Sequence, residues 1–316
     1  MIILLGSTGY IGQAFAAELR RRQLNYLPLS RTKLDYTSFP ALLSFLRETK
    51  PAFVINAAGY TGKPNVDACE TARADTLQGN ALFPQTVAQA CAAAQVSWGH
   101  VSSGCIYAGA KILSDAGIRT EKDLTRPELQ EVVRTERERI HGFTEVDPPN
   151  FTFRDPPCSF YSGIKALGEE AIANCGESYI WRLRIPFDEF DNHRNYLTKI
   201  QRYAKVYDNV NSLSHRADFA RACLDLWTLR APFGIYNVTN PGFVTTRQVV
   251  SMLERVQKPA RRFEFWENDA EFYKIGAITP RSNCVLDVSK LLGTGVKIRP
   301  VMEAVEDSLQ NWKREA

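Results

Sequence analysis

The feature that most constrains the fold is a regular alternation of short apolar runs and helix-like stretches over residues 1–110. The apolar runs are bounded by turn formers, which predicts buried strands at Met1–Leu5, Asn25–Leu29, Ala52–Ala57 and Ser97–Ser102. The stretches between them have helical patterns, at Gln13–Arg22, Phe39–Thr49 and Asp75–Ala94. Strands that alternate with helices in this way form a parallel sheet with helices on both faces. We therefore predict an α/β fold.

The alternation of strand and helix patterns ends after residue 110, because residues 110–150 are polar, charged and rich in turn formers. Beyond about residue 187, aromatic residues are mixed with turns and short helical patterns. We predict a doubly wound parallel sheet within residues 1–186 and a smaller domain formed mainly by residues 187–316, with the chain crossing between the two.

Charge and cysteine content narrow the class of protein. The 39 basic and 35 acidic residues are interspersed and the net charge is only +4, so we expect no nucleic-acid or membrane-surface partner. The seven cysteines include no Cys-x-x-Cys pair, so we expect neither a metal site nor a disulfide framework and favour a cytoplasmic location. The apolar start MIILLG is too short for a signal peptide, and no apolar run reaches the length of a membrane span.

The motif GSTGYIG lies between the first predicted strand and the first predicted helix. Glycine permits a tight turn and a close approach of backbone to phosphate, and the helix start offers free N–H groups and a positive dipole end. In this context the motif predicts a dinucleotide-binding turn formed by Gly6, Ser7, Thr8, Gly9, Tyr10, Ile11 and Gly12. The alternative is a glycine turn that only packs the helix on the strand.

Ser30 and Arg31 follow the second predicted strand, where folds that prefer NAD usually carry an acidic residue. The planar guanidinium of Arg31 suits a 2′-phosphate, which favours NADPH over NADH. An ordinary solvated arginine is the alternative.

A candidate catalytic set combines a helix and a strand end. Tyr161 and Lys165 form YSGIK, a spacing that places both side chains on one helix face. A nearby ammonium lowers the tyrosine pKa from its usual value near 10, so the pair can act as acid and base beside a nicotinamide. Ser103, at the end of WGHVSS, can hold a substrate carbonyl or can simply be a turn residue.

These motifs, in this order, resemble the extended short-chain dehydrogenases/reductases. Further blocks look like the plant bifunctional 3,5-epimerase/4-reductases of nucleotide-rhamnose synthesis, and more distantly like bacterial dTDP-4-dehydrorhamnose reductases. The most specific of them are AGYTGKPNVDACE (58–70), SSGCIY (102–107), SFYSGIKALGEE (159–170), WRLRIP (181–186), RNYLTKI (194–200) and TPRSNCVLD (279–287).

The resemblance implies a Rossmann-type sheet with a smaller C-terminal substrate-binding domain. It also implies NAD(P)H-dependent reduction of the C4 ketone of a nucleoside-diphosphate 4-keto-6-deoxy sugar. Tyr161 would give a proton to the forming alkoxide, Lys165 would tune Tyr161 and hold the ribose, and Ser103 would hydrogen-bond the carbonyl. The residues implied beside the cofactor are Asn56, Ala57, Ala58 and Pro186.

Within the same resemblance, Cys105 and Lys199 match the cysteine and lysine that exchange protons at C3 and C5 of the sugar, which implies an additional epimerase activity. A thiol near a cation is partly ionised, whereas a buried thiol is often only a small hydrophobe and the lysine can be a solvated helix residue. Arg281 matches a contact to the nucleotide diphosphate, with a surface salt bridge as the alternative. Lys63 and Asn195 are weaker candidates for contacts to sugar or phosphate.

One stretch departs from the family pattern. Residues 110–141 form an insertion relative to the plant enzymes and lie shortly after Cys105, so we expect either a lid or a reshaped sugar pocket. Two other functions stay open: another extended sugar-nucleotide epimerase or dehydratase, and a non-catalytic NADP-binding regulatory subunit. The presence of both Tyr161 and Lys165 argues against the regulatory subunit. Members of this class often form dimers, so a homodimer is possible.

Overall fold

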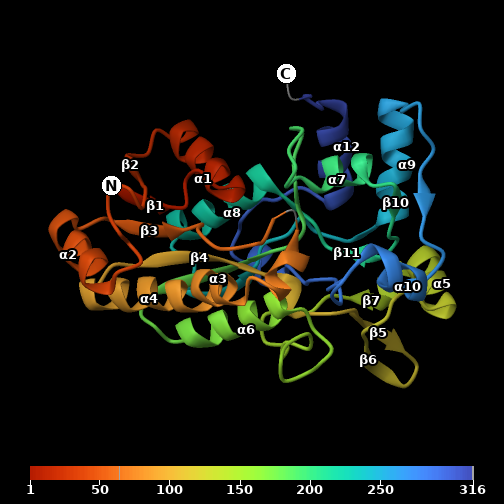
Figure 1. Ribbon diagram of the computed structural model, residues 1–316, viewed down its shortest axis with the longest axis horizontal. Coiled ribbons are helices and arrows are strands. Elements are labelled where there is room, and N and C mark those ends of the chain that lie inside the picture. Colours follow the sequence, from red (N-terminus) through yellow and green to blue (C-terminus); the bar gives the residue numbers. More distant parts are fainter. Residues whose placement is uncertain (64, 315–316) are drawn as a thin grey trace.

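The structure is a computed structural model that describes residues 1–63 and 65–314. Its centre is a six-stranded sheet in the order β13-β8-β4-β3-β1-β2, in which every pair of neighbours is parallel (Figure 1). The strands are β1 (Ile2–Leu5), β2 (Tyr26–Leu29), β3 (Phe53–Asn56), β4 (Trp98–Ser103), β8 (Ser178–Leu183) and β13 (Gly234–Asn237). The predicted α/β fold with a parallel sheet is confirmed.

Helices cover both faces of this sheet because successive strand residues point to opposite sides. Ile2 and Leu4 belong to one core, and Ile3 and Leu5 belong to another. The first core also contains residues of α1 (Tyr10–Arg21) and α8 (Arg216–Thr228). The second contains residues of α2 (Phe39–Thr49), α4 (Phe83–Ala94) and α6 (Phe160–Ile172). Figure 1 shows α4 and α6 together on the face opposite α1.

The predicted helix Asp75–Ala94 is interrupted. It consists of α3 (Arg73–Leu77), a π-helical turn η2 (Gln78–Leu82) and α4. Within the π-helical turn the buried Asn80 donates side-chain hydrogen bonds to the carbonyls of Tyr60 and Thr76. The wide turn therefore sets a side chain against the loop that follows β3, close to the site described below.

Part of the second half of the chain returns to the sheet, because β13 extends its edge and α8 packs on α1. The rest surrounds a third core, which includes residues of α7 (Tyr196–Arg202), α9 (Thr246–Gln257) and α12 (Val301–Gln310). Its short strands pair as β9 (Pro186–Phe187) with β12 (Ser214–His215), β10 (Lys205–Val206) with β15 (Glu264–Phe265), and β11 (Val210–Asn211) with β14 (Val244–Thr245). The remaining short helices are η1 (Val66–Glu70), η3 (Gly104–Ile106), η4 (Arg137–Arg139), α10 (Asp269–Glu271), η5 (Phe272–Gly276) and α11 (Ser289–Gly293). The division into domains at residue 186 stays a prediction.

The insertion folds into its own small unit. An antiparallel sheet in the order β6-β5-β7 carries β5 (Ala110–Ser114), β6 (Gly117–Glu121) and β7 (Ile140–His141), and α5 (Pro127–Thr135) follows β6 in sequence. Leu129 and Val133 of α5 join a core with Ile112 and with Phe243 from the second half. The guanidinium of Arg137 lies 4.0 Å from the centroid of the Phe243 ring. The unit is thus anchored beside the C-terminal half.

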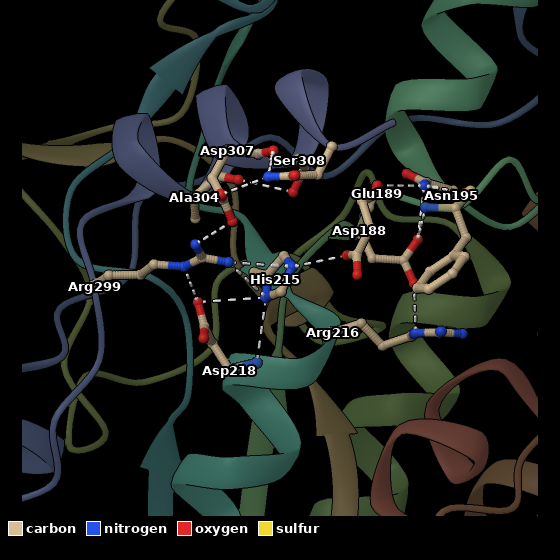
Figure 2. Close-up of polar contacts among 12 residues, drawn as sticks. Asp188, Glu189, Asn195, His215, Arg216, Asp218, Arg299, Ala304, Asp307 and Ser308 are labelled. Carbon is tan, nitrogen blue, oxygen red and sulfur yellow. Dashed lines mark hydrogen bonds and ion pairs between the residues drawn. The ribbon is translucent and has the colours of Figure 1, made fainter. Parts of the chain in front are cut away.

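A partly buried network of charges joins α8 to α12 (Figure 2). The Arg299 guanidinium pairs with Asp218 of α8 at 2.7 Å and with Asp307 of α12 at 2.6 Å. The His215 ring lies against the same arginine, 3.4 Å from Asp218 and 3.5 Å from Glu189. These pairs link the sheet layer to the third core.

The described part of the chain contains no helix that combines the length and apolarity needed to cross a membrane.

Candidate active site

One cavity of about 710 Å³ runs from the glycine turn after β1 to the aromatic residues of the C-terminal half. β1 lies between β2 and β3, so the order of the strands reverses at β1. In parallel sheets of this kind, ligands bind at the carboxyl ends of the strands where the order reverses. The wall includes Gly9 from the turn, Ser103 at the end of β4, and Trp266 directly after β15. Both halves of the chain therefore build the site.

The glycine turn cannot carry side chains at two positions. Gly6 has φ +75°, and a Cβ there would lie 2.6 Å from the Ala58 nitrogen. A Cβ on Gly12 would lie 2.0 Å from the Gly6 carbonyl oxygen. Helix α1 begins directly after Gly9, and its first turn carries the uncharged residues of YIG. Its N–H groups and positive dipole end are thus available to a phosphate, which fits a dinucleotide.

Tyr10 at the start of α1 is tied to the second half of the chain through a buried carboxylate. Its hydroxyl donates to Asp188 Oδ1 at 3.0 Å, and Arg216 pairs with Asp188 Oδ2 at 2.7 Å. The amide of Asn195 also donates to Asp188 Oδ1, at 2.8 Å, while its oxygen accepts from the Leu197 nitrogen and caps α7 (Figure 2). Asn195 is fully buried and lies outside the cavity wall, so the expectation of a direct sugar or phosphate contact is corrected.

Of the four residues that the family resemblance implies beside the cofactor, three line the cavity and one is buried outside its wall. Ala57, Ala58 and Pro186 line the cavity. Asn56 is buried: its Oδ1 accepts from the Ala58 nitrogen at 3.1 Å and its Nδ2 lies 3.2 Å from His100 Nδ1. Asn56 therefore shapes the turn that carries the two alanines.

The residues predicted to select the cofactor lie at the end of β2. The Arg31 side chain is exposed to solvent, and the Ser30 hydroxyl is 2.8 Å from that of Thr32. Neither Ser30 nor Arg31 is part of the described cavity wall. An exposed guanidinium can bind a 2′-phosphate or stay solvated, so both interpretations of Arg31 stay open.

Tyr161 and Lys165 of α6 and Ser103 at the end of β4 all line the cavity. The side chain of Ser159 caps α6 by accepting from the Ser162 nitrogen at 3.1 Å. Lys165 is buried and donates to the Val101 carbonyl at 3.3 Å. The structure thus brings the predicted catalytic set together.

The charge state of Tyr161 differs from the prediction. Burial raises its pKa well above the usual value, and the nearby cations Arg194 and Arg184 only partly oppose this. Burial also lowers the pKa of Lys165. The expected acidic tyrosine is therefore wrong for this site: burial outweighs the cations, and Tyr161 keeps its proton at neutral pH.

Cys105 and Lys199 line the same cavity. Burial raises the pKa of the Cys105 thiol, although a hydrogen bond with Ser103 and the charge of Arg184 oppose the shift. The expectation of a partly ionised thiol is corrected accordingly. Burial lowers the pKa of Lys199, and the charges of Arg194 and Arg281 lower it further.

The diphosphate contact predicted for Arg281 stays a prediction. Arg281 lines the cavity, and it also forms an ion pair with Asp67 of η1 at 2.6 Å. Its Nη1 atom is buried without a hydrogen-bond partner among the described residues. Lys63 is exposed and is not part of the described cavity wall, which does not support a substrate contact for it.

Several residues that line the cavity had no role predicted from the sequence. Arg184 and Arg194 stood inside the motif blocks WRLRIP and RNYLTKI, which was the available signal. The aromatic end of the cavity had no motif at all: its members are Tyr203, Tyr207, Trp266 and Phe272. The Tyr207 and Phe272 rings stack with centroids 3.9 Å apart.

The insertion does not form the expected lid. Within the described ranges, no residue of 110–141 lines the cavity, because α5 packs its apolar face against Phe243 instead. The described residues also form no group of three or more His, Cys, Asp or Glu side chains suited to a metal ion.

Comparison with known proteins finds relatives from Arabidopsis thaliana. A bifunctional dTDP-4-dehydrorhamnose 3,5-epimerase/reductase of Arabidopsis thaliana is 31% identical over 92% of this chain and 85% of its own length. A trifunctional UDP-glucose 4,6-dehydratase/3,5-epimerase/UDP-4-keto-L-rhamnose-reductase of the same plant is 30% identical over 97% of this chain, which spans only 41% of that relative.

Two solved structures share the fold. The UDP-rhamnose synthase of Acanthamoeba polyphaga mimivirus has a TM-score of 0.80 at 21% identity, with 98% of both chains covered. A dTDP-4-dehydrorhamnose reductase of Bacillus anthracis, solved in complex with NADP, has a TM-score of 0.74 at 19% identity, with 98% of this chain and 97% of that chain covered. Residues 1–314 match the sequence profile of the RmlD substrate-binding domain, so the chain belongs to the RmlD substrate-binding domain family.

Proposed function

We propose that this protein is an NADPH-dependent reductase that acts on the C4 ketone of a nucleoside-diphosphate 4-keto-6-deoxy sugar. The observation that carries the proposal is the convergence of Ser103, Tyr161 and Lys165 on the cavity that begins at the glycine turn. The names of the Arabidopsis relatives and the NADP complex of the Bacillus neighbour support the same reaction.

The residues present fit a dinucleotide. The turn from Gly6 to Gly12 would hold the pyrophosphate at the start of α1, and Ala57, Ala58 and Pro186 would flank the rest of the cofactor. When bound, NADPH supplies the hydride for reduction.

The proton comes from this chain's own residues. Tyr161 keeps its proton at neutral pH because burial raises its pKa, which suits the general acid of a reduction. The oxygen of Ser103 accepts from the Cys105 nitrogen at 3.2 Å, and its hydroxyl hydrogen would donate to the substrate carbonyl. Lys165, held by the Val101 carbonyl at 3.3 Å, would contact the ribose of the cofactor.

Cations at the middle of the cavity fit the diphosphate of the substrate. Arg194, Lys199 and Arg281 lie close enough for the two arginines to lower the pKa of the lysine. The orphaned Nη1 of Arg281 offers a donor to an incoming phosphate oxygen.

NADPH oxidation tests the proposal. UDP-, dTDP-, GDP- and CDP-linked 4-keto-6-deoxy sugars are added in turn, and we expect turnover with at least one of them. Tyr161→Phe should abolish turnover while NADPH still binds, as measured by fluorescence titration. Full activity of that variant would refute the proposed acid, and NADPH binding without turnover of any of these substrates would favour the regulatory subunit.

Epimerisation is a second candidate activity, favoured by the position of Cys105 and Lys199 in the wall of the same cavity. The C4 ketone acidifies C3 and C5, and these side chains can exchange protons there. NMR of the product formed in deuterated buffer tests this directly: deuterium at C3 and C5 that is lost in Cys105→Ala supports it. A reduced product without deuterium at either carbon would refute it.

A further inference from the structure

Arg184 is a buried cation in the wall of the cavity. It directly follows β8, it is only 6% exposed, and it lines the cavity. Its Nη2 donates to Asn211 Oδ1 at 2.7 Å and to the Ser282 carbonyl, and its Nε is buried without a hydrogen-bond partner in the described chain. Both of its acceptors are neutral.

Arg182 and Arg184 are both buried, but they differ in their partners. Arg182, two residues earlier, is equally buried but pairs with Glu169 at 2.7 Å. Arg184 has no carboxylate in ion-pair contact among residues 1–63 and 65–314. A buried charge without a counter-ion costs several kcal/mol. The two hydrogen bonds to neutral acceptors offset part of that cost but do not neutralise the charge, so a negative charge that forms in the cavity would be stabilised by Arg184.

Three groups lining the cavity are affected by the charge of Arg184, namely Cys105, Tyr161 and Tyr196, and Cys284 outside the wall is affected as well. The positive charge of Arg184 favours ionisation of the Cys105 thiol and of the Tyr161 phenol. Arg194 also favours ionisation of Tyr161, and both Arg194 and Arg281 lower the pKa of Lys199, whereas Arg184 is the arginine that favours ionisation of Cys105. The titratable or charged groups whose fields reach Cys105, or which its own charge affects, are Arg184, Lys165, Tyr161, Cys69, Cys158 and Cys284.

We propose that Arg184 is a positioning residue that stabilises the thiolate form of Cys105 and the negative charge that follows from it. When the thiolate removes a proton from the carbon beside the C4 ketone, an S–H bond forms and a C–H bond breaks. The electron pair of that bond moves to the C4 oxygen, so the negative charge passes from sulfur to oxygen within reach of the same guanidinium. The sugar in this step rests on the proposed function, whereas the thiolate itself does not.

The pH dependence of Cys105 alkylation tests the proposal without any sugar. Iodoacetamide reacts with the thiolate, forming a C–S bond and releasing iodide, and the modified Cys105 peptide is quantified by mass spectrometry in the full chain. In Arg184→Gln we expect the curve of alkylation rate against pH to move to higher pH. The rate at about pH 8 should fall roughly tenfold for each pH unit by which the curve moves. Arg184→Lys, which keeps the charge, should restore a large part of the rate.

Two further variants complete the test. Asn211→Asp places a carboxylate against the guanidinium and should move the curve in the same direction, which covers the case in which Arg184→Gln does not fold. Arg281→Gln removes a cavity cation that acts on Lys199 and should leave the curve in place. An unchanged curve in folded Arg184→Gln and Asn211→Asp, or an equal movement in Arg281→Gln, would overturn the proposal. A movement found in a protein that reduces no 4-keto sugar would refute the proposed function and leave this inference standing.

Discussion

The ion pair between Glu169 and Arg182 gives the most direct test of what holds the catalytic helix to the sheet. The two side chains are 7% and 3% exposed, and Arg182 donates three hydrogen bonds to the carboxylate at 2.7 to 3.1 Å. Ser102 adds a fourth, at 2.5 Å, from β4. Glu169 lies one helical turn after Lys165 on α6, so the pair fastens the helix that carries the proposed acid to β8 and β4.

Glu169→Gln removes the only carboxylate that pairs with Arg182 in the described structure and leaves the guanidinium buried. Breaking a buried pair in this way costs about 3–5 kcal/mol of stability. The double variant Glu169→Leu/Arg182→Met removes both charges and should be destabilised less than the single one. The Tyr107 hydroxyl, which Arg182 also contacts, keeps its hydrogen bond to the Asp147 carbonyl at 2.7 Å.

The free energy of unfolding is measured by urea titration and followed by fluorescence of the buried Trp98 and Trp181. The matched control is Glu170→Gln, the adjacent helix residue, whose pair with Arg154 is 48% and 79% exposed. Exposed pairs contribute about 0–1 kcal/mol, so the control should lose little. A loss in Glu169→Gln no larger than that of the control would refute the reasoning.

Three further predictions follow from the structure. In Gly12→Ala the new Cβ would lie 2.0 Å from a backbone oxygen of the glycine turn, so NADPH binding in a fluorescence titration should be lost. Arg31→Ser should weaken binding of NADPH but not of NADH by about 1.5–3 kcal/mol, and equal losses for both would contradict a 2′-phosphate contact. Burial opposes the charge of His215, but Asp218 and Glu189 outweigh it and raise its pKa. Its contribution to stability is therefore complete below about pH 6.5 and disappears as pH rises through the raised folded value. Urea unfolding at about pH 6 and about pH 9 should show this difference in the native protein and not in His215→Gln.

The sheet and the glycine turn were predictable because their signals are local. A run such as that of β1 is apolar at every position, and a strand with both faces covered requires that pattern. Gly6 and Gly12 occupy positions where any side chain would collide with backbone, so the motif itself carries the geometry. The spacing of Tyr161 and Lys165 likewise fixes their shared helix face.

The roles of individual polar side chains could not be predicted in the same way, because each role depends on partners that lie far away in the sequence. Asn195 looked like a sugar contact, yet it holds Asp188 and caps α7. Arg182 and Arg184 stand in one short motif, and only the folded chain gives one of them a carboxylate and leaves the other without. The insertion, placed by sequence next to Cys105, turns away because its apolar face finds the second half of the chain.

The protonation tendencies of the site residues could not be predicted from the sequence, because they depend on burial. Burial raises the pKa of Tyr161 and Cys105 and lowers that of Lys165 and Lys199, so each of these groups is shifted toward its neutral form. Arginine keeps its charge under such conditions, because its guanidinium does not lose its proton in proteins. The lasting positive field of the cavity therefore comes from its arginines, and it would favour the diphosphate of the proposed substrate and the alkoxide or enolate of the proposed reactions. A tyrosine that holds its proton beside such a field is arranged to protonate an oxygen, which is the direction of reduction.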